Sequence, residues 1–379
     1  MIPITDVMAD NRLRAIADKV LHEEAVSEDD ALFLLRSNDI LDIGRIAQIL
    51  RLRWNGKNAY YGVNMNLNYT NVCELRCPLC AFSCDADSPK AYLYDIREVE
   101  RRVRSALSEG IDEVHIVGGL RPDLPLSYFE EMLRTIKRID PNLFIVAFTA
   151  VEYDYFARIN NLALETVIRR LIDAGLGAIP GGGAEIFAPE VRRIISPKKI
   201  SGDRWLEVMH TAHNLGLKTN ATMLFGHIET DAHIVDHLSR IRALQSETGG
   251  FKTFVPLAFH PANTTVSGVR PRTSGYDIAR IYATSRIFLH NIPHIKALWM
   301  YVGERMAQNL LWFGVDDIGA TYNQEKVVHA AGASTPDFGS ESFLKHLITA
   351  AGFEPVRTTA AYAGSPKGAS PFESVTSTT

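Results

Sequence analysis

Three cysteines, Cys73, Cys77 and Cys80, are separated by three and then by two residues, in a segment that ends at Cys84 and holds every cysteine of the 379-residue chain. This spacing places three thiols on one short loop. Thiolates are soft ligands that select iron–sulfur clusters, zinc or Cu(I). Structural zinc sites and electron-transfer clusters normally take four protein ligands. Three ligands therefore predict a [4Fe-4S] cluster with one iron left open for a substrate or cofactor.

Cys84 leaves a second interpretation open. With it the spacing becomes C-x3-C-x2-C-x3-C, which could close a four-thiolate zinc cage in a zinc-stapled binding protein. A disulfide framework is disfavoured, because a chain of this length can build its own hydrophobic core. Buried structural cysteines would rarely gather in one loop while the rest of the chain avoids cysteine.

The composition limits the class of protein. Hydrophobic residues make up 46% and charged residues 22% of the chain, which is ordinary for a globular enzyme. The formal net charge of −4 means that the chain has no overall excess of basic residues, so neither nucleic acid nor membrane is an expected partner. The first residues lack the pattern of a signal peptide, and no apolar run approaches the length of a membrane span. With clustered, unpaired cysteines, this favours the reducing cytoplasm.

The elements that position the cysteine loop follow from hydrophobic periodicity. Residues 1–56 are predicted to be helical. In residues 57–320, strands alternate with amphipathic helices in units of about 30 residues or slightly more, the size of a βαβ unit. This pattern predicts an α/β fold with a parallel sheet closed into a full or partial TIM-like (β/α) barrel. Strands are expected at 63–68, 113–117, 144–149, 177–180, 219–225, 253–259 and 295–302, with a weak eighth at 315–318.

The remaining residues are predicted to lie outside the barrel. Residues 321–357 form a helical extension. Residues 358–379 turn to Ala, Ser, Thr, Gly and Pro, a composition typical of a disordered tail.

Residues with chemical potential follow the predicted strands. Barrel enzymes work at the carboxyl ends of their strands, so these residues are expected to meet at one end of the barrel. The cysteine loop follows the first strand, and the later strands are followed by Gly118-Gly119, Glu152, Glu185, the segment Gly226 to Glu229, and His260. This convergence predicts an enzyme.

Each of these residues also has a simpler interpretation. The glycines match neither a P-loop nor a dinucleotide fingerprint, and strand-to-helix turns use glycine for its permissive backbone. Glu152, Glu185 and Glu229 could be loop charges, or they could accept hydrogens from the hydroxyl and amino groups of a cofactor. His227 is a candidate general acid/base, with simple packing in the barrel rim as the alternative.

The cysteine spacing resembles the cluster loop of the radical S-adenosylmethionine (radical SAM) superfamily, and the resemblance extends over most of residues 60–357. Residues 181–186, 221–230 and 244–251 are similar to the menaquinone/deazaflavin branch of that superfamily. Within the branch, residues 148–152, 256–261 and 291–296 most resemble the aminofutalosine synthases. The nearest relatives to exclude are the cyclic dehypoxanthinyl futalosine synthases and the deazaflavin (FO) synthases.

Two positions depart from the superfamily pattern. Leu79 stands where an aromatic residue usually precedes the last cysteine, and Cys84 stands where relatives often carry a basic residue. Neither departure removes a cluster ligand.

The resemblance implies cofactors and roles. Cys73, Cys77 and Cys80 would bind a [4Fe-4S] cluster, and S-adenosylmethionine would chelate its open iron. Contacts to S-adenosylmethionine would come from Gly118, Gly119, Glu152, Glu185 and Gly226, and catalytic groups from His227 and Glu229. An electron donor such as a flavodoxin or a ferredoxin would reduce the cluster.

The resemblance also implies a reaction. The 5′-deoxyadenosyl radical would add to 3-[(1-carboxyvinyl)oxy]benzoate and give 6-amino-6-deoxyfutalosine with loss of a carboxylate, in menaquinone biosynthesis. Because this substrate is a dianion, His260, Arg286 and Lys296, together with His227, are the candidate cations for its carboxylates. A cyclase or FO-type relative would instead abstract hydrogen and release 5′-deoxyadenosine.

Overall fold

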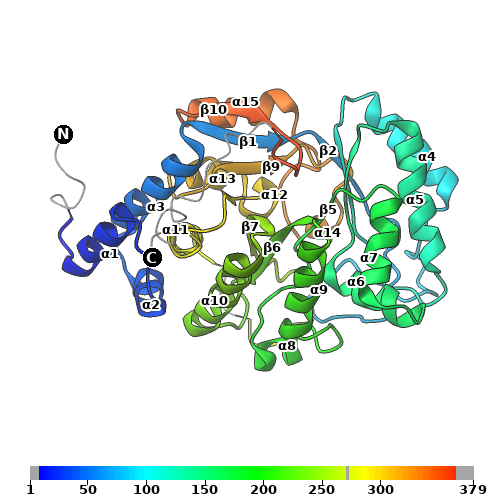
Figure 1. The fold of residues 1–379 in the computed structure, drawn as a ribbon, viewed down its shortest axis with the longest axis horizontal. Coiled ribbons are helices and arrows are strands. Elements are labelled where there is room, and N and C mark those ends of the chain that lie inside the picture. Colours follow the sequence, from blue (N-terminus) through cyan, green and yellow to red (C-terminus); the bar gives the residue numbers. More distant parts are fainter. Residues whose placement is uncertain (1–7, 270–272, 364–379) are drawn as a thin grey trace, which may run out of the picture.

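Seven parallel strands form one sheet in the order in which they occur in the sequence (Figure 1). The structure is a computed structural model that describes residues 8–269 and 273–363. The strands are β2 (Asn64–Leu67), β3 (Glu113–Ile116), β4 (Phe144–Ala147), β5 (Ala178–Ile179), β6 (Lys218–Phe225), β7 (Phe251–Ala258) and β8 (His294–Ile295). The predicted α/β fold, a curled parallel sheet of the barrel type, is confirmed.

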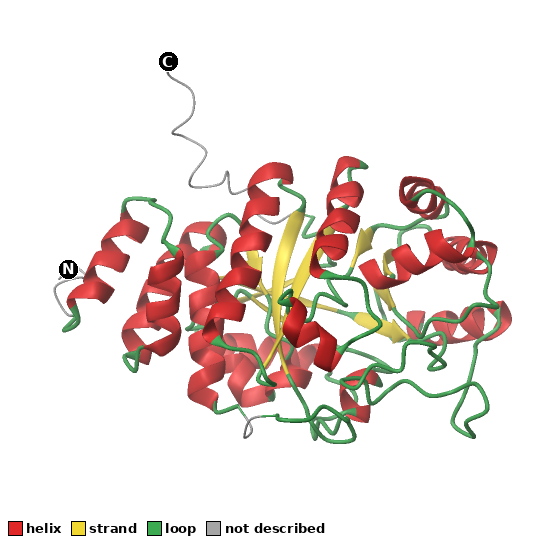
Figure 2. Ribbon diagram, turned by 90° about the horizontal axis from the view of Figure 1, so that it is seen from below, coloured by secondary structure: helices red, strands yellow, loops and turns green. Residues whose placement is uncertain are grey.

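Every connection between consecutive strands contains at least one helix, and Figure 2 shows these helices around the outside of the strands. The connecting helices are α4 (Ile96–Leu107), α5 (Leu126–Ile139), α6 (Ala150–Ile159), α7 (Leu164–Asp173), α8 (Pro189–Ile195), α9 (Gly202–Asn214), α10 (Asp231–Thr248) and α11 (Gly275–Phe288). In α7, Val167, Ile168 and Leu171 recur at helical spacing and are buried. Burial of such stripes against the sheet fixes the helices on its outer face.

The two edges of the sheet are joined by an irregular segment. Strand β9 (Asp317–Ala320) and the residues after it lie between β8 and β2, through single parallel pairs of Lys296 with Asp317 and of Met65 with Asn323. Asn66 N donates to the carbonyl oxygen of Asn323 at 2.8 Å. The barrel is therefore closed by isolated bridges rather than by a regular strand.

A second sheet lies beside the barrel. Its central strand is β1 (Asn58–Gly62), flanked by β9 and by β10 (Glu354–Arg357). The sequence pattern missed β1 and β10. Both are short, and β10 is half exposed and carries charged residues, so neither shows the apolar run of a buried strand.

The N-terminal helices are α1 (Asn11–Leu21), α2 (Glu28–Arg36) and α3 (Ile40–Asn55), and in Figure 1 they lie on the side of the barrel away from α4 and α5. Ser27 caps α2: its hydroxyl accepts a hydrogen bond from Asp30 N, and the Asp30 carboxylate accepts one from Ser27 N. After β8 come α12 (Trp299–Val302), α13 (Glu304–Leu310), α14 (Val327–Ala330) and α15 (Glu341–Ala350). Among the described residues, none of the helices has the length and apolarity needed to cross a bilayer.

Two predicted boundaries are wrong. The strand expected at 295–302 ends at Ile295, and α12 follows because Trp299 turns inward and donates its indole N–H to the carbonyl oxygen of Ala320 at 2.8 Å. The tail expected from Thr358 is ordered through residue 363: Ala360 and Tyr362 are buried and hydrogen-bonded to barrel residues. Residues 364–379 of the predicted tail lie outside the described residues.

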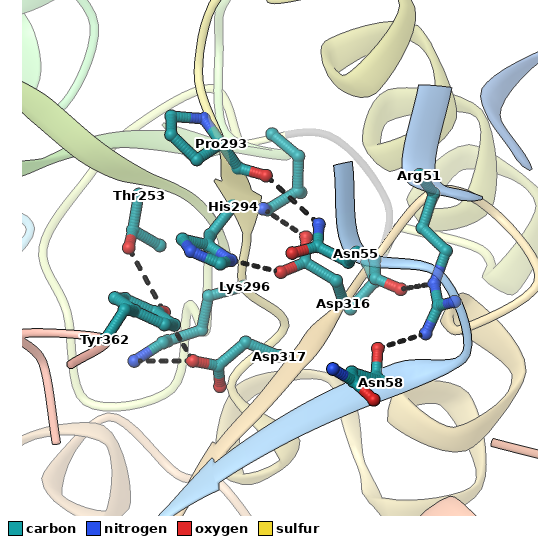
Figure 3. A network of polar contacts seen from close by, with 12 residues as sticks. Arg51, Asn55, Asn58, Thr253, Pro293, His294, Lys296, Asp316, Asp317 and Tyr362 are labelled. Atoms are coloured by element: carbon teal, nitrogen blue, oxygen red, sulfur yellow. Dashed lines mark hydrogen bonds and ion pairs between the residues drawn. The ribbon is translucent and has the colours of Figure 1, made fainter. Parts of the chain in front are cut away.

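Arg286, a predicted substrate contact, is instead fully buried in the framework. Its guanidinium donates to the carbonyl oxygens of Ile292 (2.9 Å) and Gly314 (3.2 Å) and pairs with Asp316 at 3.3 Å. Asp316 in turn contacts His294 at 2.5 Å (Figure 3). Burial lowers the pKa of Arg286 to about 10, although Asp316 opposes that shift. Arg286 therefore joins α11 to the amino ends of β8 and β9, and it does not line the substrate cavity described below.

Replacing Arg286 with Met should destabilise the fold by about 3–5 kcal/mol, because Asp316 would keep a buried charge with one cation removed. Urea unfolding of Arg286→Met measures this. The matched control is Arg169→Met, since Arg169 and its partner Glu165 are both exposed and the change should cost less than about 1 kcal/mol. Equal losses in the two variants would contradict the framework role of Arg286.

Candidate active site

A cavity of about 340 Å³ occupies the interior of the barrel. Leu79 and Cys80 of the cysteine loop form part of its wall, and so do Glu113, Lys296 and Ala360. Glu113 is the first residue of β3, whereas the cysteine loop follows the carboxyl end of β2. The cavity therefore extends from the carboxyl ends of the strands to their amino ends.

The cysteine loop is closed by its own backbone. Val72 and Cys84 form a parallel bridge, in which Cys73 N donates to Cys84 O at 3.2 Å and Cys84 N donates to Asn71 O at 2.9 Å. Inside the loop, Cys80 N donates to Cys77 O at 2.9 Å. The main chain of Cys84 thus fastens the base of the loop that presents the other three thiols.

The thiols fit a cluster better than a zinc ion. A zinc cage needs its thiolates on one metal at about 2.3 Å, and within the described residues no three Cys, His, Asp or Glu side chains converge on one such point. A [4Fe-4S] cluster takes each thiolate on a different iron, so its ligands need not converge. Burial raises the pKa of Cys77 to about 11, so metal binding must displace the proton of this thiol.

The glycine pair after β3 lies directly against the cysteine loop. A Cβ atom on Gly119 would lie 2.0 Å from the carbonyl oxygen of Val72, and one on Gly118 would lie 2.6 Å from the Tyr69 ring. No larger residue fits either position without moving the loop or the ring. The glycines therefore permit the end of β3 to approach the residues that carry the thiols.

Glu152 lies buried beneath this glycine pair rather than on the cavity wall. Its carboxylate accepts hydrogen bonds from Gly118 N (3.2 Å), the Tyr69 hydroxyl (3.0 Å) and Thr149 N (2.6 Å). Burial raises its pKa to about 7 against the effect of these donors. Glu152 therefore contacts Gly118 directly, and Gly119 is contacted by the Tyr69 hydroxyl. The predicted contact of Glu152 with a cofactor stays a prediction.

Glu185 and Lys199 form a buried ion pair on the cavity wall, with 2.5 Å between Nζ and Oε1. Burial opposes the charge of Lys199, but Glu185 and the nearby Cys77 outweigh it and raise the pKa of the lysine. The same lysine holds the pKa of Glu185 below its usual value in spite of burial. Glu185 was predicted, whereas Lys199 was missed because it lies beyond α8, away from any predicted strand end.

His227 and Glu229 are buried within their own turn after β6, and neither lines the cavity. Glu229 accepts bonds from Gly226 N (2.7 Å) and His227 N (2.9 Å), and its carboxylate lies 3.0 Å from His227 Nδ1. His227 Nε2 lies 3.0 Å from the carbonyl oxygen of Leu224. These contacts hold the shape of the strand end, so a direct catalytic role for either residue stays a prediction.

His260 and Lys296 line the cavity as predicted substrate contacts should, whereas Arg286 does not. His260 Nε2 lies 2.9 Å from the carbonyl oxygen of Tyr301, and Lys296 pairs with Asp317 at 3.1 Å. The wall also contains polar residues that were not predicted as site residues, namely Asn64, Asn66, Glu113, His115, Asn220 and Thr222. These residues alternate with apolar ones at 64/66, 113/115 and 220/222. Alternate residues of a strand point to the same face, so this pattern could have indicated a polar interior of the barrel.

A thiol loop that follows the first strand of a curled parallel sheet and lines a cavity inside it defines a class of enzyme, and comparisons with known proteins agree. The family model of the radical SAM superfamily matches residues 67–241, and that of the CofH/MqnC C-terminal region matches residues 248–368. The chain belongs to the radical SAM superfamily. It is an enzyme of that type and uses a [4Fe-4S] cluster with S-adenosylmethionine.

Within that class, the chain is similar to enzymes with three different names. Aminodeoxyfutalosine synthase of Thermus thermophilus is 39% identical over 93% of this chain and 96% of its own length. A 5-amino-6-(D-ribitylamino)uracil–L-tyrosine 4-hydroxyphenyl transferase of Methanopyrus kandleri is 37% identical over 89% of this chain and 93% of its own. Cyclic dehypoxanthine futalosine synthase of Streptomyces coelicolor is 36% identical over 85% and 81%, respectively.

Solved structures share the fold. The hydrogenase maturase HydG of Carboxydothermus hydrogenoformans superposes with a TM-score of 0.72 at 18% identity, over 92% of this chain and 80% of its own. Methylornithine synthase gives a TM-score of 0.71 at 17% identity, over 90% of this chain and 97% of its own. At such identities the likeness shows the fold alone.

Replacing Cys84 with Ala should leave iron content and visible absorption near wild type, because the backbone of Cys84, not its thiol, closes the loop. Cys80→Ala is the matched comparison and should lose most of the iron. Iron and zinc analysis of anaerobically reconstituted proteins checks both variants. Equal loss of metal in the two variants would favour a four-thiolate site.

Replacing Glu152 with Gln should flatten the pH dependence of stability. Its pKa is raised on folding, so its stabilising contribution is complete below about pH 4.5 and is lost as the pH rises through about 7. The wild type should lose roughly 2 kcal/mol relative to Glu152→Gln between pH 5 and pH 8. Urea unfolding of both proteins at the two pH values measures this, and parallel pH curves would contradict it.

Proposed function

We propose that this chain is an aminofutalosine synthase of menaquinone biosynthesis. It joins the 5′-deoxyadenosyl group of S-adenosylmethionine to the enolpyruvyl carbon of 3-[(1-carboxyvinyl)oxy]benzoate, and it releases 6-amino-6-deoxyfutalosine and the lost carboxylate as bicarbonate or carbon dioxide. The observation that carries the proposal is one continuous cavity with the cysteine loop at one end and Lys296 at the other. Near full-length similarity to the Thermus enzyme supports it.

When bound at Cys73, Cys77 and Cys80, the cluster supplies the electron that cleaves S-adenosylmethionine into methionine and the 5′-deoxyadenosyl radical. The residues around the loop bind and orient the cofactor. Gly118-Gly119 offers main-chain groups to the methionyl end, and Glu185 accepts hydrogen bonds from the ribose or adenine. Gly226 shapes the neighbouring strand end with a positive φ of 87° that favours glycine.

The rest of the cavity suits an aromatic dianion. Val117, Leu257 and Phe259 contribute apolar wall that can cover a benzoate ring and exclude water from a reactive radical. Lys296 and His260 offer donors to the carboxylates. A flavodoxin or a ferredoxin supplies the electrons in this proposal.

The second candidate is a hydrogen-abstracting relative, either a cyclase or an FO-type enzyme. Relatives with other names are nearly as similar as the aminodeoxyfutalosine synthase, so this candidate follows directly from the comparisons. It shares the thiol loop and the cofactor but releases free 5′-deoxyadenosine. The two candidates therefore differ in their products.

Mass spectrometry of an anaerobic reaction distinguishes them. The reconstituted enzyme is mixed with dithionite, S-adenosylmethionine and 3-[(1-carboxyvinyl)oxy]benzoate, with L-tyrosine plus 5-amino-6-(D-ribitylamino)uracil as the competing substrates in a parallel reaction. We expect methionine and a product that joins adenosine to the benzoate skeleton. Free 5′-deoxyadenosine without this product would contradict the proposal and favour the second candidate.

A further inference from the structure

The segment after β10 runs beneath the barrel, at the end opposite the cysteine loop. Thr358 N donates to the carbonyl oxygen of Tyr61 at 2.9 Å, and Ala360 N donates to Glu113 Oε2 at 2.5 Å. Ala360 forms part of the cavity wall. Since Glu113 begins β3, residues 358–363 close the amino-terminal end of the barrel, and we call them the floor segment.

Tyr362 anchors the floor segment. Its ring stacks on His294 with 3.7 Å between centroids and meets Tyr60 edge-on at 5.6 Å. Its hydroxyl accepts a hydrogen bond from Thr253 Oγ1 at 3.1 Å and donates to Asp317 Oδ2 at 2.5 Å (Figure 3). Because both its ring and its hydroxyl are in contact with neighbours, this buried side chain is held in one orientation.

Asp317 links Tyr362 to Lys296. Its Oδ1 accepts from Gly319 N at 2.7 Å, while Oδ2 contacts both the Tyr362 hydroxyl and, at 3.1 Å, Lys296 Nζ. Lys296 Nζ also lies 5.6 Å from the centre of the Tyr362 ring. Lys296 therefore shares the Asp317 carboxylate with the Tyr362 hydroxyl and Gly319 N.

We propose that the floor segment completes the substrate cavity and that Tyr362 is a positioning residue, which acts through Asp317 to aim the Lys296 ammonium at a substrate carboxylate. This inference rests on the proposed function for the identity of the substrate. An ammonium has three donors, and one of them serves Asp317. Lys296 lines the cavity, where the buried carboxylate of Glu113 also interacts with its charge, and we infer that its remaining donors face a substrate carboxylate there.

The test uses a hydroxyl deletion and a matched control. Tyr362→Phe keeps the stacked ring but removes the bond to Asp317. Tyr60→Phe removes another buried hydroxyl from the same aromatic cluster, one with no hydrogen-bond partner among the described residues. Calorimetry without reductant measures the Kd for 3-[(1-carboxyvinyl)oxy]benzoate. We expect Tyr362→Phe to weaken binding about tenfold and Tyr60→Phe to leave it within about twofold.

A double-mutant cycle separates positioning from general structural damage. If Tyr362 acts through Lys296, Tyr362→Phe should change the Kd less than about twofold in a Lys296→Met background. An equal tenfold loss in both backgrounds, or no loss in the wild-type background, would overturn the inference.

The same samples distinguish the two proposals. Formation of the adenosyl adduct by the wild type, together with an unchanged Kd in Tyr362→Phe, overturns the positioning role and supports the proposed function. If 3-[(1-carboxyvinyl)oxy]benzoate binds and the effect of Tyr362→Phe on its Kd depends on Lys296, but no adduct forms, the positioning role is supported and the proposed function is overturned.

Discussion

The close approach of β3 to the cysteine loop is the contact on which the site depends. The carbonyl oxygen of Val72 occupies the space where Gly119 would otherwise carry a Cβ atom. Tyr69 and Glu152 hold the glycine pair from below through buried hydrogen bonds. Parallel strands bring all their carboxyl ends to one end of the barrel. The packing of Gly118-Gly119 therefore sets the distance between the main chain of β3 and the loop that carries the thiols.

Paired charges lie along the cavity that this arrangement encloses. The Glu185–Lys199 pair lies near the cysteine loop, and the Lys296–Asp317 pair lies at the floor. An isolated buried charge would cost several kcal/mol. Each of these charges therefore lies beside an opposite one, and Glu185, Lys199 and Lys296 also line the cavity. Apolar side chains such as Val117, Leu257 and Phe259 make up further parts of the wall. Under the proposed function, the Lys296–Asp317 pair would meet a carboxylate of the substrate.

The sequence predicted the scaffold better than the site. Strand–helix alternation and cysteine spacing are local patterns, and they led to the correct fold and loop. Arg286 has the residue type of a substrate contact, but its guanidinium bonds to the carbonyl oxygens of Ile292 and Gly314 and pairs with Asp316. The last two partners are distant in the sequence, and no local pattern reveals them. Tyr362 lies in a stretch whose composition is typical of disorder, although a single aromatic ring buried against His294 orders it. The ion-pair partners of Lys199 and Lys296 are Glu185 and Asp317, which are not adjacent to them in the sequence.

The two ends of the cavity come from different parts of the chain, and this division bears on how related enzymes differ. The cysteine loop, the glycine pair and the Glu185 turn lie in the part that matches the superfamily as a whole. Lys296, Asp317 and Tyr362 lie in the C-terminal region, whose family model covers a narrower set of enzymes. Cofactor cleavage needs the same groups whatever the substrate, whereas recognition of the substrate does not. Specificity is therefore expected to change at the floor of the barrel, while the thiol end stays the same.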